Sequence, residues 1–156
     1  MKPRVYIETT IPSFYHENRR EPEMVARRHW TREWWHRFSI GFEVVTSQAV
    51  LDELEAGDYA SKPKVLALTE AIPILPFEPA IIEIVEAYIA HKVMPNDPVG
   101  DALHLALASY HKCDFLLTWN CQHLANANKF VHMRRVNVLL GLHVPLLVTP
   151  LELMGD

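Results

Sequence analysis

The side chains best suited to chemistry are acids and an amide placed where apolar segments stop. Glu8 follows the apolar run Val5–Ile7, and Asn120 closely follows the run Phe115–Leu117. Asp101 lies in the first turn of a helical segment that precedes the second of these runs. In parallel sheets, ligands bind outside the carboxyl ends of strands, so these polar groups are candidates for one site.

A further acid can come from the helical segment Gln48–Ala56, which carries Asp52, Glu53 and Glu55. Spacing alone does not choose Glu53 among them. Three carboxylates within a few ångströms raise one another's pKa unless a cation lies among them. Oxygen ligands favour Mg²⁺ or Mn²⁺, which activates water in phosphodiester hydrolysis. The alternative of three unrelated surface acids remains open at this point.

Motifs for other chemistries are missing from the sequence. No glycine-rich loop follows a strand, so a phosphate-cradling nucleotide fold is unsupported. There is no GxSxG elbow, and the nine histidines form no HExxH motif or Cys/His cluster, which argues against zinc. His104 lies three residues after Asp101 and could touch it, although a core or rim histidine is the preferred interpretation.

The helix that carries Asp101 is predicted to begin with Pro98, where proline loses no helical hydrogen bond. Asn96 or Asp97 is the candidate cap before it. The residues that follow at helical spacing form an apolar face: Leu103, Ala106, Leu107 and Tyr110. The uninterrupted apolar run after this helix predicts a central strand that is covered on both faces.

The remaining segments alternate between predicted strands and helices. The strands are Arg4–Ile7, Phe42–Thr46, Pro73–Phe77, Phe115–Leu117 and Pro145–Pro150. The helices other than the one carrying Asp101 are Pro22–Phe38, Gln48–Ala56, Lys64–Ala71, Ala80–Val93 and Asn126–Leu142, and the turn Thr9–Ser13 leads into a further one. The third predicted strand, Pro73–Phe77, contains two prolines, which place it at an edge of the sheet. This alternation predicts a three-layer α/β fold, with helices on both faces of a parallel sheet.

Composition indicates one globular domain that spans residues 1–156. Apolar residues make up 49% of the chain and charged residues 22%, with a net charge of -4. No segment resembles a signal peptide or could span a membrane. Cys113 and Cys121 fit no CxxC pattern, so we expect reduced thiols in a cytoplasmic protein. The slight acidity argues against broad electrostatic binding of nucleic acid but permits a local basic patch.

The most basic stretch is the predicted helix Pro22–Phe38 with the loop before it. Its cationic residues are Arg19, Arg20, Arg27, Arg28, Arg32 and Arg37, and its tryptophans are Trp30, Trp34 and Trp35. One interpretation is a solvated helix face with tryptophans in the core. The other is a surface for RNA or a protein partner. We expect at least one of these tryptophans to be partly exposed in the isolated chain and covered by a partner.

Four blocks in order, followed by a C-terminal segment, resemble a known family. They are VYIETTIPS (5–13), QAVLDEL (48–54), DALHLA (101–106) and LLTWN (116–120), followed by TPLELM (149–154). The chain resembles PIN-domain proteins over essentially its whole length, and is similar to VapC-type toxins of toxin–antitoxin pairs.

The resemblance implies a PIN-like fold with a five-stranded parallel sheet and a Mg²⁺- or Mn²⁺-dependent endoribonuclease. The family's four acidic positions fall on Glu8, Glu53, Asp101 and Asn120, of which the three carboxylates would hold the metal. Glu8 stands where the family mostly has Asp, and Asn120 removes a charge. Thr9, Thr118 and His123 are candidates for contacting the phosphate or positioning the acids.

The resemblance also implies partners, which are an RNA substrate, a cognate antitoxin protein and a second copy in a homodimer. Two alternatives belong to other functional classes. One is a PIN-like module that binds nucleic acid or protein with weak or no catalysis, for which Asn120 is the main argument. The other is a receiver-like signalling domain, but no second acid stands beside Glu8 and no suitable lysine ends a late strand.

Overall fold

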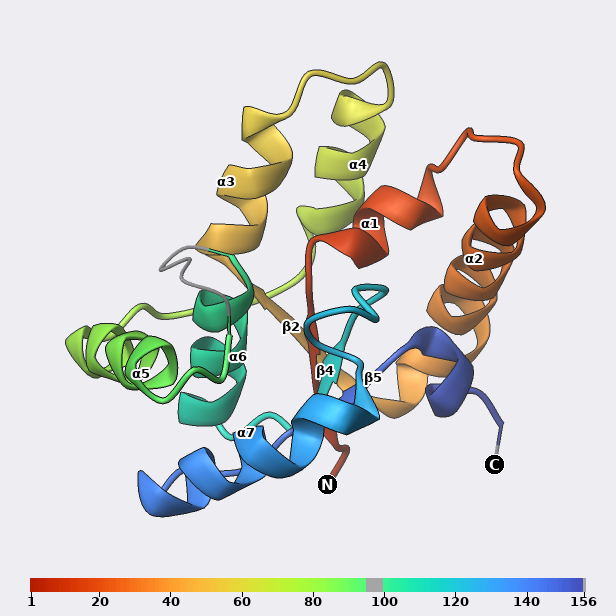
Figure 1. Ribbon diagram of the computed structural model, residues 1–156. Helices are drawn as coiled ribbons and strands as arrows, with labels where there is room; N and C mark the ends of the chain where they lie inside the picture. The colour runs from red at the N-terminus through yellow and green to blue at the C-terminus, as the bar shows by residue number, and fades with distance from the viewer. Residues whose placement is uncertain (95–99, 156) are drawn as a thin grey trace.

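The computed structural model describes residues 1–94 and 100–155, which contain one five-stranded parallel sheet (Figure 1). The strands are β1 Arg4–Ile7, β2 Glu43–Ser47, β3 Ile74–Leu75, β4 Phe115–Leu117 and β5 Leu146–Val148. Their order across the sheet is β3-β2-β1-β4-β5. The predicted parallel sheet is confirmed.

The strand β1 holds the middle position, and β4 lies beside it rather than at the centre itself. Val5 of β1 is in register with Val44 of β2 on one side and Phe115 of β4 on the other. The proline-flanked β3 is an edge strand, as predicted, and β5 forms the other edge. Because all five strands are parallel, their carboxyl ends lie at the same end of the sheet. Glu8 and Asn120 follow their strands at this end, which we call the carboxyl edge.

The helices account for the remaining predicted segments. They are α1 Thr10–Tyr15, α2 Pro22–Glu33, α3 Gln48–Ala56, α4 Lys62–Thr69, α5 Pro79–Ala90, α6 Asp101–Tyr110 and α7 Ala127–Leu139. A short 3₁₀ helix, η3 Pro150–Leu153, follows β5. The predicted start of α6 at Asn96, Asp97 and Pro98 lies outside the described residues.

The predicted helix Pro22–Phe38 differs from a regular α-helix in its last turns. After α2 it continues as a π-helix, η1 Trp34–Phe38, and ends in a 3₁₀ turn, η2 Ser39–Gly41. The wider π turn is closed by the amide of Ser39, which donates to the carbonyl of Trp34. The π-helix begins with two adjacent tryptophans, of which Trp34 is fully buried and Trp35 is partly exposed.

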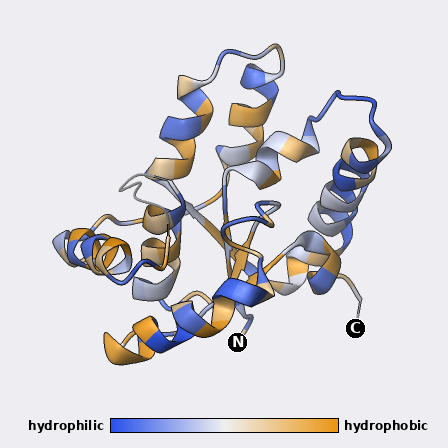
Figure 2. Cartoon of the chain, viewed as in Figure 1, coloured by the Kyte–Doolittle hydropathy of each residue, from blue (hydrophilic) through white to orange (hydrophobic). Residues whose placement is uncertain are grey.

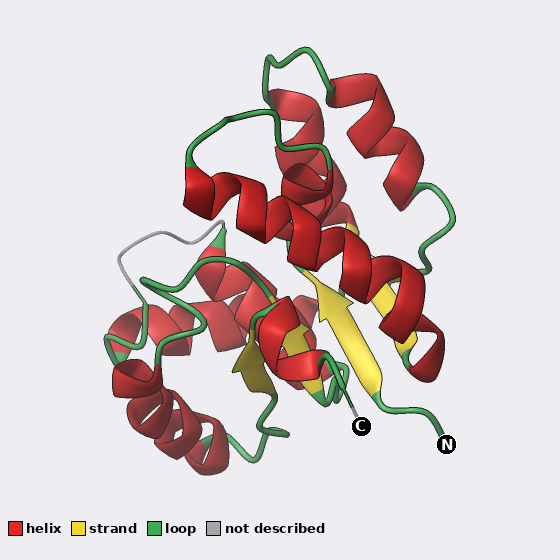
Figure 3. Cartoon of the chain, turned by 90° about the vertical axis from the view of Figure 1, so that its right-hand side faces the viewer, coloured by secondary structure: helices red, strands yellow, loops and turns green. Residues whose placement is uncertain are grey.

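The sheet separates two apolar cores, and its strands run between helical layers (Figure 3). One core contains Tyr6, Val45 and Leu116 and packs against α3, α5, α6 and α7. The other contains Val5, Ile7 and Leu117 and packs against α1 and Trp34. Adjacent strand residues thus face opposite layers, which confirms the three-layer α/β fold.

Among the residues that the structure describes, no helix combines the length and hydrophobicity that a bilayer span requires. Trp30 and Trp35 are partly exposed, as we expected of at least one tryptophan in this stretch.

Candidate metal centre

Glu8 is held at the end of β1 by hydroxyl and amide donors. Its carboxylate oxygen Oε1 accepts hydrogen bonds from the amide of Thr10 at 3.1 Å, from Thr10 Oγ1 at 2.5 Å and from Thr118 Oγ1 at 2.6 Å. The other oxygen accepts none from the described residues and is available to a ligand. Burial raises the pKa of Glu8, while the charge of His104 and these hydrogen bonds oppose the rise.

Glu53 reaches the same place from α3, which Ser47 caps at the end of β2. Thr9 Oγ1 donates to its Oε2 at 2.5 Å, and His104 Nε2 lies 2.8 Å from its Oε1. Burial would raise the pKa of Glu53, but the hydrogen bond and charge of His104, with the Thr9 hydroxyl, outweigh it and lower that pKa. Glu53 is therefore ionised in the folded protein.

His104 links Glu53 to the core of the sheet. Its side chain is fully buried, and its Nδ1 lies 2.7 Å from the hydroxyl of Tyr6, which is 2.6 Å from Ser47 Oγ. Burial would lower the pKa of His104, but the Glu53 hydrogen bond and the charges of Glu8, Glu53 and Asp101 outweigh it and raise that pKa. The raised pKa favours the protonated imidazole, whose Nε2 donates to Glu53.

Three side chains meet closely enough to share one cation. Glu8, Glu53 and His104 each place a ligand atom within 4.8 Å of the other two. Two carboxylates with an imidazole suit Mn²⁺ and other first-row divalent ions, and the carboxylates alone suit Mg²⁺. The oxygen of Glu8 without a described hydrogen-bond partner supports such a fit. We call these three residues, two glutamates and one histidine, the acidic cluster.

Asp101 and Asn120 form a second pair beside the acidic cluster. Asn120 Nδ2 donates to Asp101 Oδ2 at 3.0 Å, and Asn120 Oδ1 accepts from the backbone amides of Gln122 and His123. Burial raises the pKa of Asp101, and the charge of Glu53 adds to the rise against opposing contributions from His104, His123 and Asn120. These charges place Asp101 in the electrostatic field of the cluster, although it is not one of the three close-set ligands.

The predicted phosphate-contacting residues have other partners in this structure. Thr9 and Thr118 donate to Glu53 and Glu8, respectively, and so fix the orientation of both carboxylates. His123 Nδ1 lies 3.1 Å from Lys129 Nζ. The residues that sequence reasoning overlooked are Tyr6, Thr10 and Ser47, because an apolar run or a helix cap gives no sign of a catalytic neighbour.

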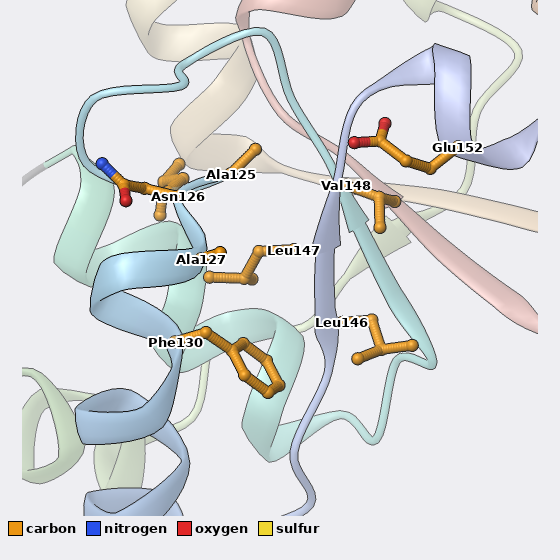
Figure 4. Close-up of a pocket in the computed structure, with 9 residues that line it drawn as sticks. Ala125, Asn126, Ala127, Phe130, Leu146, Leu147, Val148 and Glu152 are labelled. Atoms are coloured by element: carbon orange, nitrogen blue, oxygen red, sulfur yellow. The ribbon is translucent and has the colours of Figure 1, made fainter.

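A separate hollow lies between α7 and β5, away from the acidic cluster. It has a volume of about 260 Å³ and is lined mainly by apolar side chains, among them Phe130, Leu146, Leu147 and Val148 (Figure 4). Glu152 and Asn126 are its polar members. It shares no lining residue with the acidic cluster.

Comparison with known proteins identifies the family. A family model described as PIN domain matches residues 5–121, a range that contains Glu8, Glu53, Asp101 and Asn120. No curated protein and no solved structure matches the chain. The matched range covers most of the sequence and four of the five strands, together with Glu8, Glu53 and Asp101. The chain therefore belongs to the PIN-domain family, whose members are typically metal-dependent nucleases.

Proposed function

We propose that this protein is a Mg²⁺- or Mn²⁺-dependent endoribonuclease that hydrolyses RNA phosphodiesters. The observation that carries the proposal is the acidic cluster at the carboxyl edge of a PIN-domain sheet. Buried acids without a cation are costly, and the raised pKa of Glu8 reflects that cost. A divalent cation would offset it.

The proposed ligands are Glu8 and Glu53 from the acidic cluster and Asp101, which lies beside it. Asn120 positions Asp101 through its amide, and His104, the third member of the cluster, holds Glu53. When bound, the cation supplies an activated water and neutralises charge on the phosphate. The chain itself fixes the orientation of the carboxylates before the cation binds. Thr10 and Thr118 orient Glu8, while Thr9 orients Glu53. We further propose that Thr9, Thr118 and His123 contact the phosphate or position the acids.

The second candidate is a PIN-like binding module with weak or no catalysis. The close contact between His104 Nε2 and Glu53 Oε1 favours it, since this contact gives one acid of the cluster a partner without a metal. Asn120 also favours it, because an amide replaces a charge that would attract a cation. Binding of Mn²⁺ by the purified protein separates the nuclease from such a module.

The biological setting that we propose is that of a cytoplasmic toxin bound by a cognate antitoxin. This extension rests on the resemblance of the sequence blocks to VapC-type toxins, and the partial exposure of Trp30 and Trp35 leaves surface for such a partner. A homodimer belongs to the same proposal. A gene for a small protein beside this one, and a stable complex on co-expression, would support it. Light scattering that shows only monomer would contradict the homodimer.

The decisive experiment is cleavage of single-stranded RNA by purified protein with Mg²⁺, with Mn²⁺ and with a chelator. Activity is expected with at least one metal and is expected to disappear in Glu53→Gln and in Asp101→Asn. Glu55→Gln is the matched control, because Glu55 is exposed on the same helix and lies outside the cluster. Absence of cleavage with both metals, or an active Glu53→Gln variant, would overturn the proposal.

A further inference from the structure

A polar pocket lies at the opposite end of α1 from the acidic cluster. It has a volume of about 320 Å³ and is formed by the segment after α1, the helix α2, the loop before α4 and the first turn of α4. Its cationic or titratable members are His16, Arg28, Arg32 and Lys64. We call it the basic pocket. Figure 1 shows the loop between α1 and α2 close to α4, and Figure 2 shows that this loop is hydrophilic.

The two arginines are fixed by backbone carbonyls at the end of α1. Arg28 Nη1 donates to the carbonyl of Glu17 at 3.2 Å, and Arg32 Nε donates to the carbonyl of Tyr15 at 2.7 Å. The guanidinium of Arg32 also lies 5.1 Å from the centre of the Tyr15 ring. Each guanidinium has five N–H donors and uses only one in these contacts. Both arginines are therefore positioned with donors to spare.

No acid neutralises these cations within the described parts of the chain. Arg28, Arg32 and Lys64 have no carboxylate within salt-bridge distance there. Glu17 lines the pocket, but its carboxylate accepts two hydrogen bonds from the guanidinium of Arg19, at 2.7 and 2.8 Å, and one from the Arg19 amide at 3.0 Å. Burial and then the charges of Arg32 and Lys64 lower the pKa of His16, consistent with an uncompensated positive field.

Two elements connect the basic pocket with the acidic cluster. The helix α1 begins at Thr10, which donates to Glu8, and its six residues rise about 9 Å toward the pocket. The helix α3 carries Glu53, and the segment after it supplies Ala60 and Ser61 to the pocket wall. A few nucleotides of extended RNA can span such a distance.

We propose that the basic pocket binds a backbone phosphate of single-stranded RNA whose scissile phosphodiester lies at the acidic cluster. The inference rests on the proposed nuclease function and adds a substrate-binding subsite to it. Arginine forks and a lysine without carboxylate partners match phosphate oxygens. An acidic peptide is the other anionic candidate, but such a partner usually needs apolar anchor pockets. Among the described residues that line this pocket, Ala60 is the only apolar one.

A purely structural role would explain the arginines, because they cap carbonyls at the end of α1, but it does not explain Lys64. Lys64 is exposed on α4 and makes no hydrogen bond or salt bridge with the described residues. Lys64→Glu is therefore the primary test variant, since no hydrogen bond or salt bridge with the described residues is lost. Arg135→Glu is the control, because Arg135 is exposed on α7 and the net charge changes equally.

The test is fluorescence anisotropy with labelled single-stranded oligoribonucleotides of about 4 and about 12 nucleotides. A chelator prevents cleavage, so binding is measured apart from activity. The parent is expected to bind the longer RNA more tightly than the shorter one. Lys64→Glu is expected to lower affinity for the longer RNA about tenfold. It should also reduce the slope of log K against log salt concentration by about 0.7, the value for one phosphate contact.

The proposal is overturned if Lys64→Glu binds the longer RNA as the parent does, or if Arg135→Glu loses as much affinity. It is also overturned if a labelled polyaspartate peptide binds the parent as tightly as the RNA does and depends equally on Lys64. Failure of the nuclease function looks different, because the parent would then cleave no RNA with metal while Lys64 still determined binding of the longer RNA.

Discussion

At the scale of single residues, His104 is buried between the hydroxyl of Tyr6 and the carboxylate of Glu53. His104→Ala removes both hydrogen bonds and leaves a cavity in a fully buried position. We expect the free energy of unfolding to fall by about 2–4 kcal/mol, measured by urea denaturation. His29→Ala, an exposed histidine on α2, should change it by less than about 0.5 kcal/mol. Equal stability of the two variants would show that the His104 contacts contribute little.

Asn120 tests how closely the second pair of residues is coupled to the metal. Asn120→Asp replaces the amide that donates to Asp101 with a second carboxylate. Repulsion should lower the stability of the metal-free protein by about 1–3 kcal/mol, and Mn²⁺ should restore more of it than in the parent. Thermal unfolding with and without Mn²⁺ measures both effects. Asn128→Asp, on the exposed start of α7, is the control and should show neither.

These residues also show what sequence can and cannot predict about a site. Glu8 and Asn120 could be predicted as candidates from position alone, because each follows an apolar strand. Glu53 could be chosen over Asp52 and Glu55 only through family resemblance, since all three lie on one helix. The contact between His104 and Glu53 was not predicted, because it depends on how α6 and α3 pack across the sheet edge, which no local pattern specifies.

At the scale of elements, α3 delivers Glu53 to the site, and Ser47 determines where α3 begins. Ser47 Oγ accepts from the amide of Val50 and lies 2.6 Å from the Tyr6 hydroxyl. Ser47→Ala should cost about 1–2 kcal/mol of unfolding free energy, measured by urea denaturation. Ser61→Ala is the matched control, because Ser61 precedes α4 without a side-chain cap and should cost far less. Similar losses in both variants would argue against the cap.

The bounds of some helices and strands could be predicted from local sequence, and those of others could not. The helix α3 has the predicted bounds, because its serine cap and its apolar face both indicate the same segment. The helix α4 starts two residues before its predicted start, with Pro63 in its first turn. The predicted strand Pro73–Phe77 shortens to Ile74–Leu75 beside its prolines. The π-helix Trp34–Phe38 has no local signature, because its wide turn accompanies tertiary burial of Trp34.

At the scale of the whole molecule, the two cores on either side of the sheet should protect whatever they bury. Cys113 is fully buried, and burial raises the pKa of its thiol to about 12, whereas Cys121 is exposed. In native protein near neutral pH we expect a disulfide reagent to modify Cys121 rapidly and Cys113 only through unfolding. Thiol titration should therefore report one fast equivalent in buffer and two in urea. Two fast equivalents in buffer would mean that the core opens locally.

The stability of the whole fold should also depend on a divalent cation, and Glu8 is the residue that tests this linkage. Because burial raises the pKa of Glu8, its ionised form is unfavourable in the metal-free fold, and Glu8→Gln should unfold at the same temperature as the parent or higher. Mn²⁺ at about 100 times its dissociation constant should stabilise the parent by about 2.7 kcal/mol but leave Glu8→Gln unchanged. Glu86→Gln, an exposed residue on α5, should respond to Mn²⁺ as the parent does. Equal stabilisation of all three proteins in thermal unfolding would place the cation away from Glu8.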